Sequence, residues 1–350
     1  MPTRSESTDG SSSSGRTGSN DTVPAADTWA SWHAARASHN RCLQFRVNSG
    51  RARVSCLLCA TPMGSPRWLV PFVARRLPRE LAKRLVHASQ PEQVQGALCA
   101  SLQAVHEAWL QSLEPTLSRR DELLQAPDQR PGEASLTALE AELSSSCSLA
   151  LAVVMDGEQL YVANLGRTRV LLLRGEEEPQ PLTVEHSVRN ADELARLAHL
   201  GLDTSTLTEQ ALPVTRCLGA HPRRRRPDGP DPVSNEPELC GPLNMESGCR
   251  LVFLSDGLCA ALNCSGISVQ EADQLVGRLS SQPGSARQML SQLLDHCQLP
   301  ADWPHEVTLM VVSLCEEEAP PPPPVAPSDG RVDPYVDFTP LVHALEAVAR

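Results

Sequence analysis

Two apolar runs joined by a tight turn limit the folds open to this chain more than any other feature. The runs cover residues 148–155 and 159–164, and Asp156-Gly157 lies between them. Asp-Gly is typical of a tight hairpin turn in which both residues take positive φ, so the runs are predicted to pair as antiparallel strands. A sheet has apolar residues to bury, so the chain also needs a second layer packed against it.

Other segments show the periodicity of helices and strands. Further strands are expected at residues 54–59, 169–173, 251–255 and 307–313, and helices at residues 69–87, 94–113, 136–143, 192–202, 268–279 and 286–297. Pro78 lies inside the first of these helices and is expected to kink or divide it. Ser268 and Glu271 predict a capping box. Helices interleaved with hairpin-linked strands favour an α+β fold in which helices cover antiparallel sheets.

Changes in composition divide the chain into four parts. Residues 1–28 are polar and of low complexity, and they cannot bury enough apolar surface to order themselves. A folded domain is expected over residues 29–316. Residues 317–330 contain the run Pro320–Pro324, which is typical of a stiff spacer, and residues 331–350 are expected to form a separate short element.

Charge and hydropathy exclude two classes of partner. The net charge of -11 and the pI of about 5.4 would repel nucleic acid, so none is expected to bind. No stretch is apolar over the length that a membrane span needs, and residues 1–30 lack the apolar segment of a signal peptide. We therefore expect a cytoplasmic protein, with the nucleus as a second compartment in which its 12 cysteines would also stay reduced.

Cys56 and Cys59 form a CxxC pair. This spacing occurs in zinc and redox sites, but no second pair follows at zinc-finger spacing, and the pair lies within an apolar run. A buried free cysteine packs as a small hydrophobic residue. We favour two buried structural thiols over a zinc or redox site.

Four segments, taken in order, resemble the motifs of the type 2C metal-dependent serine/threonine phosphatases. They are residues 160–169 (LYVANLGRTR), 182–186 (LTVEH) with Glu193 and Arg196 behind them, 213–220 (PVTRCLGA) and 251–258 (LVFLSDGL). The resemblance spans roughly residues 42–315. It implies a four-layer α-β-β-α sandwich of antiparallel sheets.

That family holds two Mn²⁺ or Mg²⁺ ions on carboxylates from an early DGHGG turn, an SDG motif and a late DN pair. This chain has no Asp or Glu in residues 57–77, where the turn is expected, and His305 stands where the late Asp is expected. Arg167 and Ala220 replace two further Asp residues of the family motifs. Asp256, in the SDG motif, is the one of these carboxylates that remains, as a relic of the family's metal site that is not expected to bind a metal ion.

No catalytic residue, no metal site and no cofactor are therefore predicted. One carboxylate does not hold two hydrated divalent ions, so Asp256 is interpreted as a turn residue that caps the end of a strand. The alternative is a substitute metal site formed by Asp256, His305 and Glu306. The arginine that grips phosphate in the family corresponds to Arg46 or Arg51 of this chain.

Two segments are similar to one non-catalytic branch of the family. Residues 185–203 and 330–338 are similar to the phosphatase-like subunits that bind and activate the transforming-growth-factor-β-activated kinase, a MAP kinase kinase kinase. The resemblance implies that the partner is a protein kinase and that the C-terminal tail binds it.

The tail has the composition of an interaction helix. The chain holds two Tyr and four Phe, and Tyr335 and Phe338 both fall in the tail. Apolar residues follow Phe338 at i+3, i+4 and i+7, which is typical of an amphipathic helix that lies in a partner's groove. The predicted partner-binding residues are Tyr335, Val336, Phe338, Leu341, Val342 and Leu345. The alternative is that the tail folds back on its own domain.

Three functions remain open at this point. We favour a non-enzymatic adaptor that binds and activates a kinase. The second is a weak or atypical metal-dependent phosphatase built around Asp256. The third is a phosphopeptide-binding module that uses Arg216 or Arg169 without hydrolysis. The run Arg223–Arg226 is interpreted as part of a solvated loop, with nuclear import as the alternative.

Overall fold

The computed structural model of the chain describes most of residues 28–314. The described residues are 28–34, 40–49, 52–63, 68–125, 133–208, 212–219, 230–246, 248–282, 285–300, 303 and 305–314, and all lie in the compact unit Met1–Glu316. The predicted disordered N-terminus (apart from Thr28), the proline spacer and the tail lie outside them. So do Arg51, Ala220, Arg223–Arg226, Tyr335, Val336, Phe338, Leu341, Val342 and Leu345.

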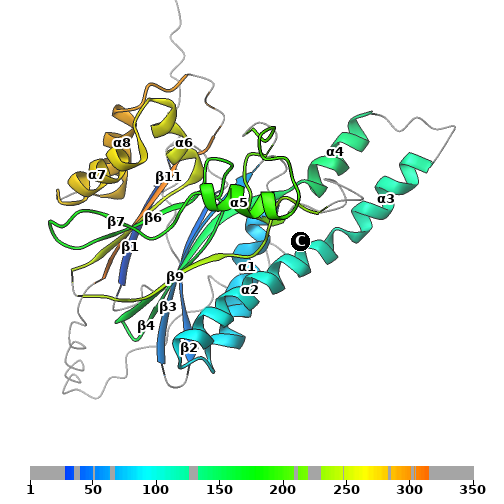
Figure 1. The fold of residues 1–350 in the computed structure, drawn as a ribbon. Coiled ribbons are helices and arrows are strands. Elements are labelled where there is room, and N and C mark those ends of the chain that lie inside the picture. Colours follow the sequence, from blue (N-terminus) through cyan, green and yellow to red (C-terminus); the bar gives the residue numbers. More distant parts are fainter. Residues whose placement is uncertain are drawn as a thin grey trace, which may run out of the picture. The chain divides into compact units, whose positions relative to one another are not determined.

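Two antiparallel sheets form the centre of the fold (Figure 1). In the first sheet the order is β1 (Thr28–Ala34), β11 (Thr308–Leu314), β10 (Arg250–Leu254), β6 (Arg169–Leu173) and β7 (Gln180–Pro181). In the second it is β2 (Arg41–Ser49), β3 (Ala52–Met63), β4 (Ser146–Met155), β5 (Gln159–Leu165) and β9 (Glu238–Asn244), and β8 (Leu218–Gly219) also pairs with β4.

Eight helices occur among the described residues. They are α1 (Leu69–Leu85), α2 (Pro91–Ser112), α3 (Glu114–Gln125), α4 (Glu133–Leu143), α5 (Ala191–His199), α6 (Asp256–Cys264), α7 (Val269–Ser280) and α8 (Ala286–Asp295). In this described part of the chain, no helix combines the length and the apolar character needed to cross a bilayer.

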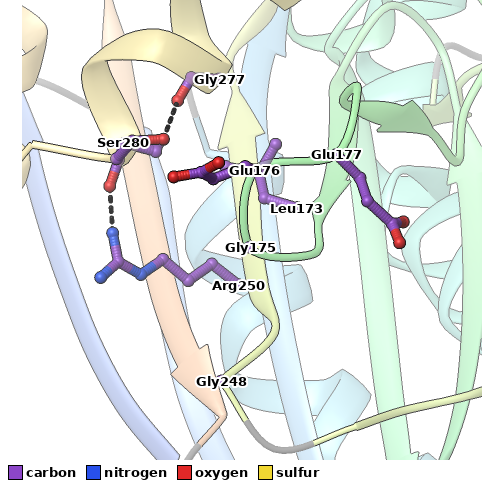
Figure 2. Close-up of a pocket in the computed structure, with 9 residues that line it drawn as sticks. Leu173, Gly175, Glu176, Glu177, Gly248, Arg250, Gly277 and Ser280 are labelled. Carbon is purple, nitrogen blue, oxygen red and sulfur yellow. Dashed lines mark hydrogen bonds between the residues drawn. The ribbon is translucent and has the colours of Figure 1, made fainter.

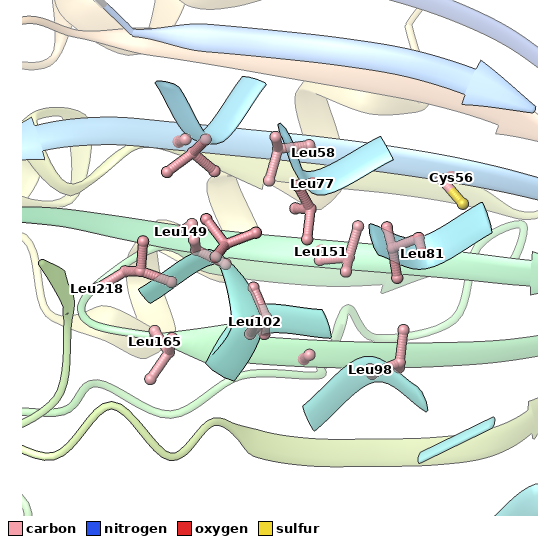
Figure 3. Close-up of a cluster of buried hydrophobic side chains, with 14 of the residues drawn as sticks. Cys56, Leu58, Leu77, Leu81, Leu98, Leu102, Leu149, Leu151, Leu165 and Leu218 are labelled. Carbon is pink, nitrogen blue, oxygen red and sulfur yellow. The ribbon is translucent and has the colours of Figure 1, made fainter. Parts of the chain in front are cut away.

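Three clusters of buried side chains show that the fold has four layers. The first cluster packs α1 and α2 against the outer face of the second sheet; Figure 3 shows Leu77, Leu81, Leu98 and Leu102 of these helices over the strands. The second cluster lies between the two sheets, and the third packs α6, α7 and α8 against the first sheet. The predicted α+β sandwich of antiparallel sheets is confirmed.

Strand β4 lies in the middle of the second sheet and is buried on both faces. Its side chains alternate, because successive residues of a strand point to opposite faces. Leu149, Leu151 and Val153 join the helix-facing cluster, whereas Ala150 and Ala152 join the cluster between the sheets. Large residues thus meet the helices and small residues meet the other sheet, which suits a chain with only 3% aromatic residues.

The predicted hairpin is confirmed. Asp156 has φ 53° and Gly157 has φ 78°, and β4 pairs with β5 from Leu149↔Leu165 to Met155↔Gln159. Three residues, 156–158, link the two strands, and the Glu158 backbone N–H donates to the Met155 carbonyl at 3.0 Å. Asp156 and Gly157 are therefore the central residues of the turn, and both take the left-handed conformation that was predicted for them.

The two thiols of the CxxC pair are buried, as predicted, and they lie on opposite faces of their strand. Both Cys56 and Cys59 have 0% exposure and lie on β3. Residues three apart on a strand point to opposite faces. Cys56 accordingly lies among the helix-facing residues, and Cys59 lies between the sheets, 3.9 Å from the Cys42 sulfur atom.

Several elements differ from the prediction. Strand β2 was not expected, because an edge strand held by β3 alone does not need a strict apolar alternation. Strand β9 and helices α3 and α6 were also not expected; α6 is a short helix that follows β10 directly after Ser255. Pro78 does not divide α1, which is one helix from Leu69 to Leu85.

The N-terminus of α7 offers a test of the fold. Ser268 Oγ accepts from the Glu271 backbone N–H, and the Glu271 carboxylate accepts from the Ser268 backbone N–H at 2.8 Å, which completes the predicted capping box. Ser268→Ala should cost about 1 kcal/mol. Thermal unfolding should show a Tm lower by roughly 2–4 °C. Gln274→Ala, on the exposed face of the same helix, is the control, and equal Tm values for the two variants would contradict the role of the cap.

Candidate functional site

Asp256 is the first residue of α6, at the end of β10. Ser255 precedes it as the N-cap, and its Oγ accepts hydrogen bonds from the backbone N–H groups of Leu258 at 3.4 Å and Thr308 at 2.9 Å. A Cβ added to Gly257 would lie 2.1 Å from the Glu306 backbone oxygen atom, so only glycine allows this approach. The start of α6 is therefore held firmly against the start of β11.

The carboxylate of Asp256 faces an arginine. Arg167 Nε lies 3.1 Å from Asp256 Oδ1 and 3.4 Å from Glu185 Oε1. The Arg167 and Asp256 side chains are each 18% exposed and that of Glu185 is 35% exposed, so this cluster is largely shielded from water. Asp256 is not an isolated turn residue: it is one member of an ion-pair cluster.

The backbone beneath Arg167 is fixed from both sides. The Arg167 backbone N–H donates to Ser148 Oγ at 3.3 Å. Gly166 has φ +102°, and a Cβ there would meet Ser148 Oγ at 2.1 Å. The Gly166 backbone N–H donates to His186 Nδ1 at 3.0 Å, and the His186 backbone N–H donates back to the Gly166 carbonyl at 3.0 Å.

His186 is a packed residue of this framework. It is 1% exposed, and because its Nδ1 accepts from Gly166, the ring proton lies on Nε2. The Nε2 atom lies 3.4 Å from Glu238 Oε2, and His186 lowers the pKa of the Glu238 carboxyl. The structure thus gives His186 a positioning role beneath the turn at Gly166.

A second cluster of charges surrounds Glu193, which belongs, together with Arg196, to one of the motif segments identified in the sequence. Glu193 is 1% exposed and accepts from Arg196 Nε at 3.1 Å and from Arg216 Nε at 2.8 Å. Burial raises the pKa of the Glu193 carboxyl, but the hydrogen bonds from the two arginines outweigh burial and lower the pKa to about 2. Arg196 Nη2 also donates to the backbone oxygen atoms of Thr215 and Pro232, so the network ties α5 to the segment before β9.

Arg169 and Arg216 both have protein partners, which argues against their use as phosphate ligands. Arg169 forms a two-point ion pair with Asp273 of α7 and donates to the Thr183 carbonyl at 3.0 Å. Arg216 is engaged by Glu193 and by the Glu236 carbonyl. The geometry therefore does not favour the phosphopeptide-binding interpretation of these two arginines.

The first metal-binding carboxylate of the family is expected near the end of β3, but this chain has no acidic residue there. Pro62 and Met63 are the last residues of this strand, paired with Cys147 and Ser146 of β4. Met63 Sδ accepts from Ser148 Oγ at 3.4 Å. These positions offer a thioether and a proline ring to the site, and neither is a ligand that hard cations prefer.

The structure does not assemble the substitute ligand set of Asp256, His305 and Glu306. Glu306 Oε2 accepts from the Asn40 backbone N–H at 3.2 Å, and the His305 ring packs edge-on against Trp303 with centroids 5.1 Å apart. Within the described ranges, no three His, Cys, Asp or Glu side chains are arranged to hold a metal ion.

Arg46, a predicted site residue, and a pocket that was not predicted are two further features of the described residues. Arg46 is exposed on β2, where it faces Ser55 of β3 in the strand register. A pocket of about 270 Å³ opens between the β6–β7 turn and the end of α7, where Arg250 donates to the Ser280 carbonyl (Figure 2). None of its lining residues was a predicted site residue.

Sequence reasoning missed the partners of the site residues. It found Asp256, Arg167, Glu193 and Arg196, but it did not foresee that Arg167 would face Asp256. Ser148, Glu238 and Asp273 were not singled out at all. The sequence held an indication for Arg167 alone. An arginine stands where the family motif has a carboxylate, and a partly buried arginine needs a negatively charged partner nearby.

The Glu193 cluster predicts a component of acid stability. Since the pKa of Glu193 is lowered on folding, its contribution is complete above the unfolded value of about 4.3 and is lost as pH falls toward 2. Glu193→Gln should lower the free energy of unfolding by about 3 kcal/mol at pH 7. Urea unfolding at pH 7 and between pH 4.5 and 2.5 measures this.

The control for that experiment is Glu122→Gln, which breaks an exposed ion pair with Arg119. Such a pair contributes roughly 0.2–1 kcal/mol. A Glu193→Gln protein with the same acid sensitivity as the native chain would contradict the assignment.

The sequence matches the family described as Protein phosphatase 2C over residues 95–302, more than half of the chain. A C. elegans sex determining protein is similar in structure, with a TM-score of 0.55 and 16% identity over 82% of this chain and 65% of that one. That likeness supports the fold alone.

Two bacterial phosphatase structures also match this chain. The S. agalactiae serine/threonine phosphatase has 17% identity and a TM-score of 0.47, covering 82% of this chain and 99% of that chain. The M. tuberculosis serine/threonine phosphatase PstP/Ppp has 16% identity and a TM-score of 0.48, covering 83% of this chain and 100% of that chain.

Proposed function

Since the chain belongs to the protein phosphatase 2C family but pairs Asp256 with an arginine, we propose that it is a non-catalytic member, an adaptor that binds and activates a protein kinase. The observation that carries this proposal is the 3.1 Å contact between Arg167 Nε and Asp256 Oδ1. A guanidinium group already holds the one motif carboxylate that the chain retains.

The residues at the site do not fit a pair of divalent cations. Mn²⁺ and Mg²⁺ need several carboxylate oxygen atoms, and a site needs its full ligand count. The end of β3 brings Pro62 and Met63, and Arg167 Nε lies 3.1 Å from Asp256 Oδ1. An arginine within ion-pair distance of a metal ligand would also repel the metal. We therefore assign no catalytic step to this cluster.

The proposed partner is a MAP kinase kinase kinase similar to the transforming-growth-factor-β-activated kinase. The support is the resemblance of residues 330–338 to the kinase-binding tails of activating subunits, together with the placement of Tyr335 and Phe338 behind a proline run. Aromatic side chains bury a large area at a low entropic cost, so they suit binding anchors. Binding would activate the kinase only if the tail contacts its active conformation more favourably.

The tail proposal is tested with the full chain and the purified kinase domain. Phe338→Ala should weaken binding by roughly 30-fold, the effect of losing an aromatic anchor of about 2 kcal/mol. His343→Ala is the matched control, because residue 343 falls off the helical face formed by Phe338, Leu341 and Leu345. Isothermal titration calorimetry measures both. Equal affinities for the native chain and Phe338→Ala would rule out the tail as the anchor.

The loss of catalysis is tested separately. The full chain should hydrolyse p-nitrophenyl phosphate in millimolar MnCl₂ no faster than its Asp256→Ala variant, because no metal-activated nucleophile is expected. A parallel reaction in EDTA gives the background. Hydrolysis that requires Mn²⁺ and disappears in Asp256→Ala would instead support an atypical phosphatase.

A further inference from the structure

We propose that Arg167 is the protein's internal substitute for a divalent cation: its guanidinium ties the start of α6 to the loop before α5 and makes the stability of the fold independent of metal ions. This inference rests on the proposed absence of a metal centre. It goes further, because it assigns a structural task to the residue that stands in a motif carboxylate's place.

The position of Arg167 in the topology suits this task. Strand β5 belongs to the second sheet and β6 belongs to the first, so the turn at residues 166–168 carries the chain from one sheet to the other. Asp256 begins α6, which packs on the first sheet. The Arg167–Asp256 pair therefore joins the crossing point between the sheets to a helix of the outer layer.

Hydrogen bonds to its backbone hold the turn at residues 166–168 in place, independently of the Arg167 side chain. Besides the bonds of Gly166 and Arg167 to His186 and Ser148, the Thr183 hydroxyl donates to the Thr168 carbonyl and accepts from the Val170 N–H, each at 2.9 Å. An arginine whose backbone is already fixed loses less conformational entropy on forming an ion pair than an arginine on a mobile surface loop. The pair should accordingly stabilise more than an ordinary surface ion pair.

The charges around Arg167 explain why a cation is needed there. Asp256 and Glu185 both place a carboxylate oxygen within 3.4 Å of the same nitrogen atom, Arg167 Nε. Without a positive charge between them, two partly shielded carboxylates would repel each other. A guanidinium supplies this charge covalently, so no metal has to be recruited for the fold to form.

The experiment compares thermal unfolding of the full-length chain and four variants in EDTA and in MnCl₂. The variants are Arg167→Gln, Arg167→Lys, Asp256→Asn and the Arg167→Gln/Asp256→Asn double variant. The native chain should have the same Tm in both buffers. Arg167→Gln should lower the Tm by roughly 2–4 °C, and Arg167→Lys should lower it less because it keeps the charge. The double variant should lose less than the sum of the two single losses, because the residues form one pair.

Two results would overturn the proposal. One is a Tm of the native chain that rises with MnCl₂ and no longer rises in Asp256→Asn, because Asp256 would then bind a metal. The other is an Arg167→Gln chain as stable as the native one, with additive losses in the double variant. Arg119→Gln, which breaks an exposed pair with Glu122, is the matched control.

The outcome is separable from the test of the proposed function. Kinase binding is measured through Phe338 in the tail, whereas this experiment measures the Tm of the folded domain. A chain that fails to bind the kinase can still show the Arg167 coupling. A chain that binds the kinase can still lack it.

Discussion

The burial of β4 between a helix layer and a second sheet is the constraint on which the rest of the structure depends. The strand is covered on both faces from Cys147 to Met155, with leucines toward α1 and α2 and alanines toward the other sheet. Small side chains of β4 allow the two sheets to pack closely, with Phe253 as the aromatic member of the cluster between them. Ser148 of the same strand accepts the backbone N–H of Arg167, so the core also fixes the turn that carries the site.

Charged side chains near the site form ion pairs within the protein. Glu193 is neutralised by Arg196 and Arg216, Arg169 by Asp273, and Asp256 by Arg167. Breaking one side of a shielded pair costs more than removing both, because it leaves a charge without its partner. Because the charged residues of the site pair with one another, the fold does not need metal ions to neutralise them. This is the physical basis on which we propose binding, rather than hydrolysis, as its function.

Much of the fold followed from local patterns. The bounds of β6, the positive φ values of the turn at Asp156-Gly157 and the capping box of α7 were all predicted, because each depends on residues close together in the chain. Predictions were poorer for β2 and β9, the edge strands of the second sheet, which pair on one side only and carry half-exposed residues. The short helix α6 was hidden because a β-strand ends immediately before it.

The sequence by itself determined the fold class, the positions of the motif segments and the absence of an acidic residue between residues 57 and 77. Only the tertiary structure decided which charges pair. Arg167, Glu185 and Asp256 come from three separate segments, and no periodicity relates them. Their contact arises because β5 and β6 belong to different sheets and the crossing turn meets the end of β10. Local propensities act over a few residues, whereas ion pairing acts between whatever side chains the packing of the core brings together.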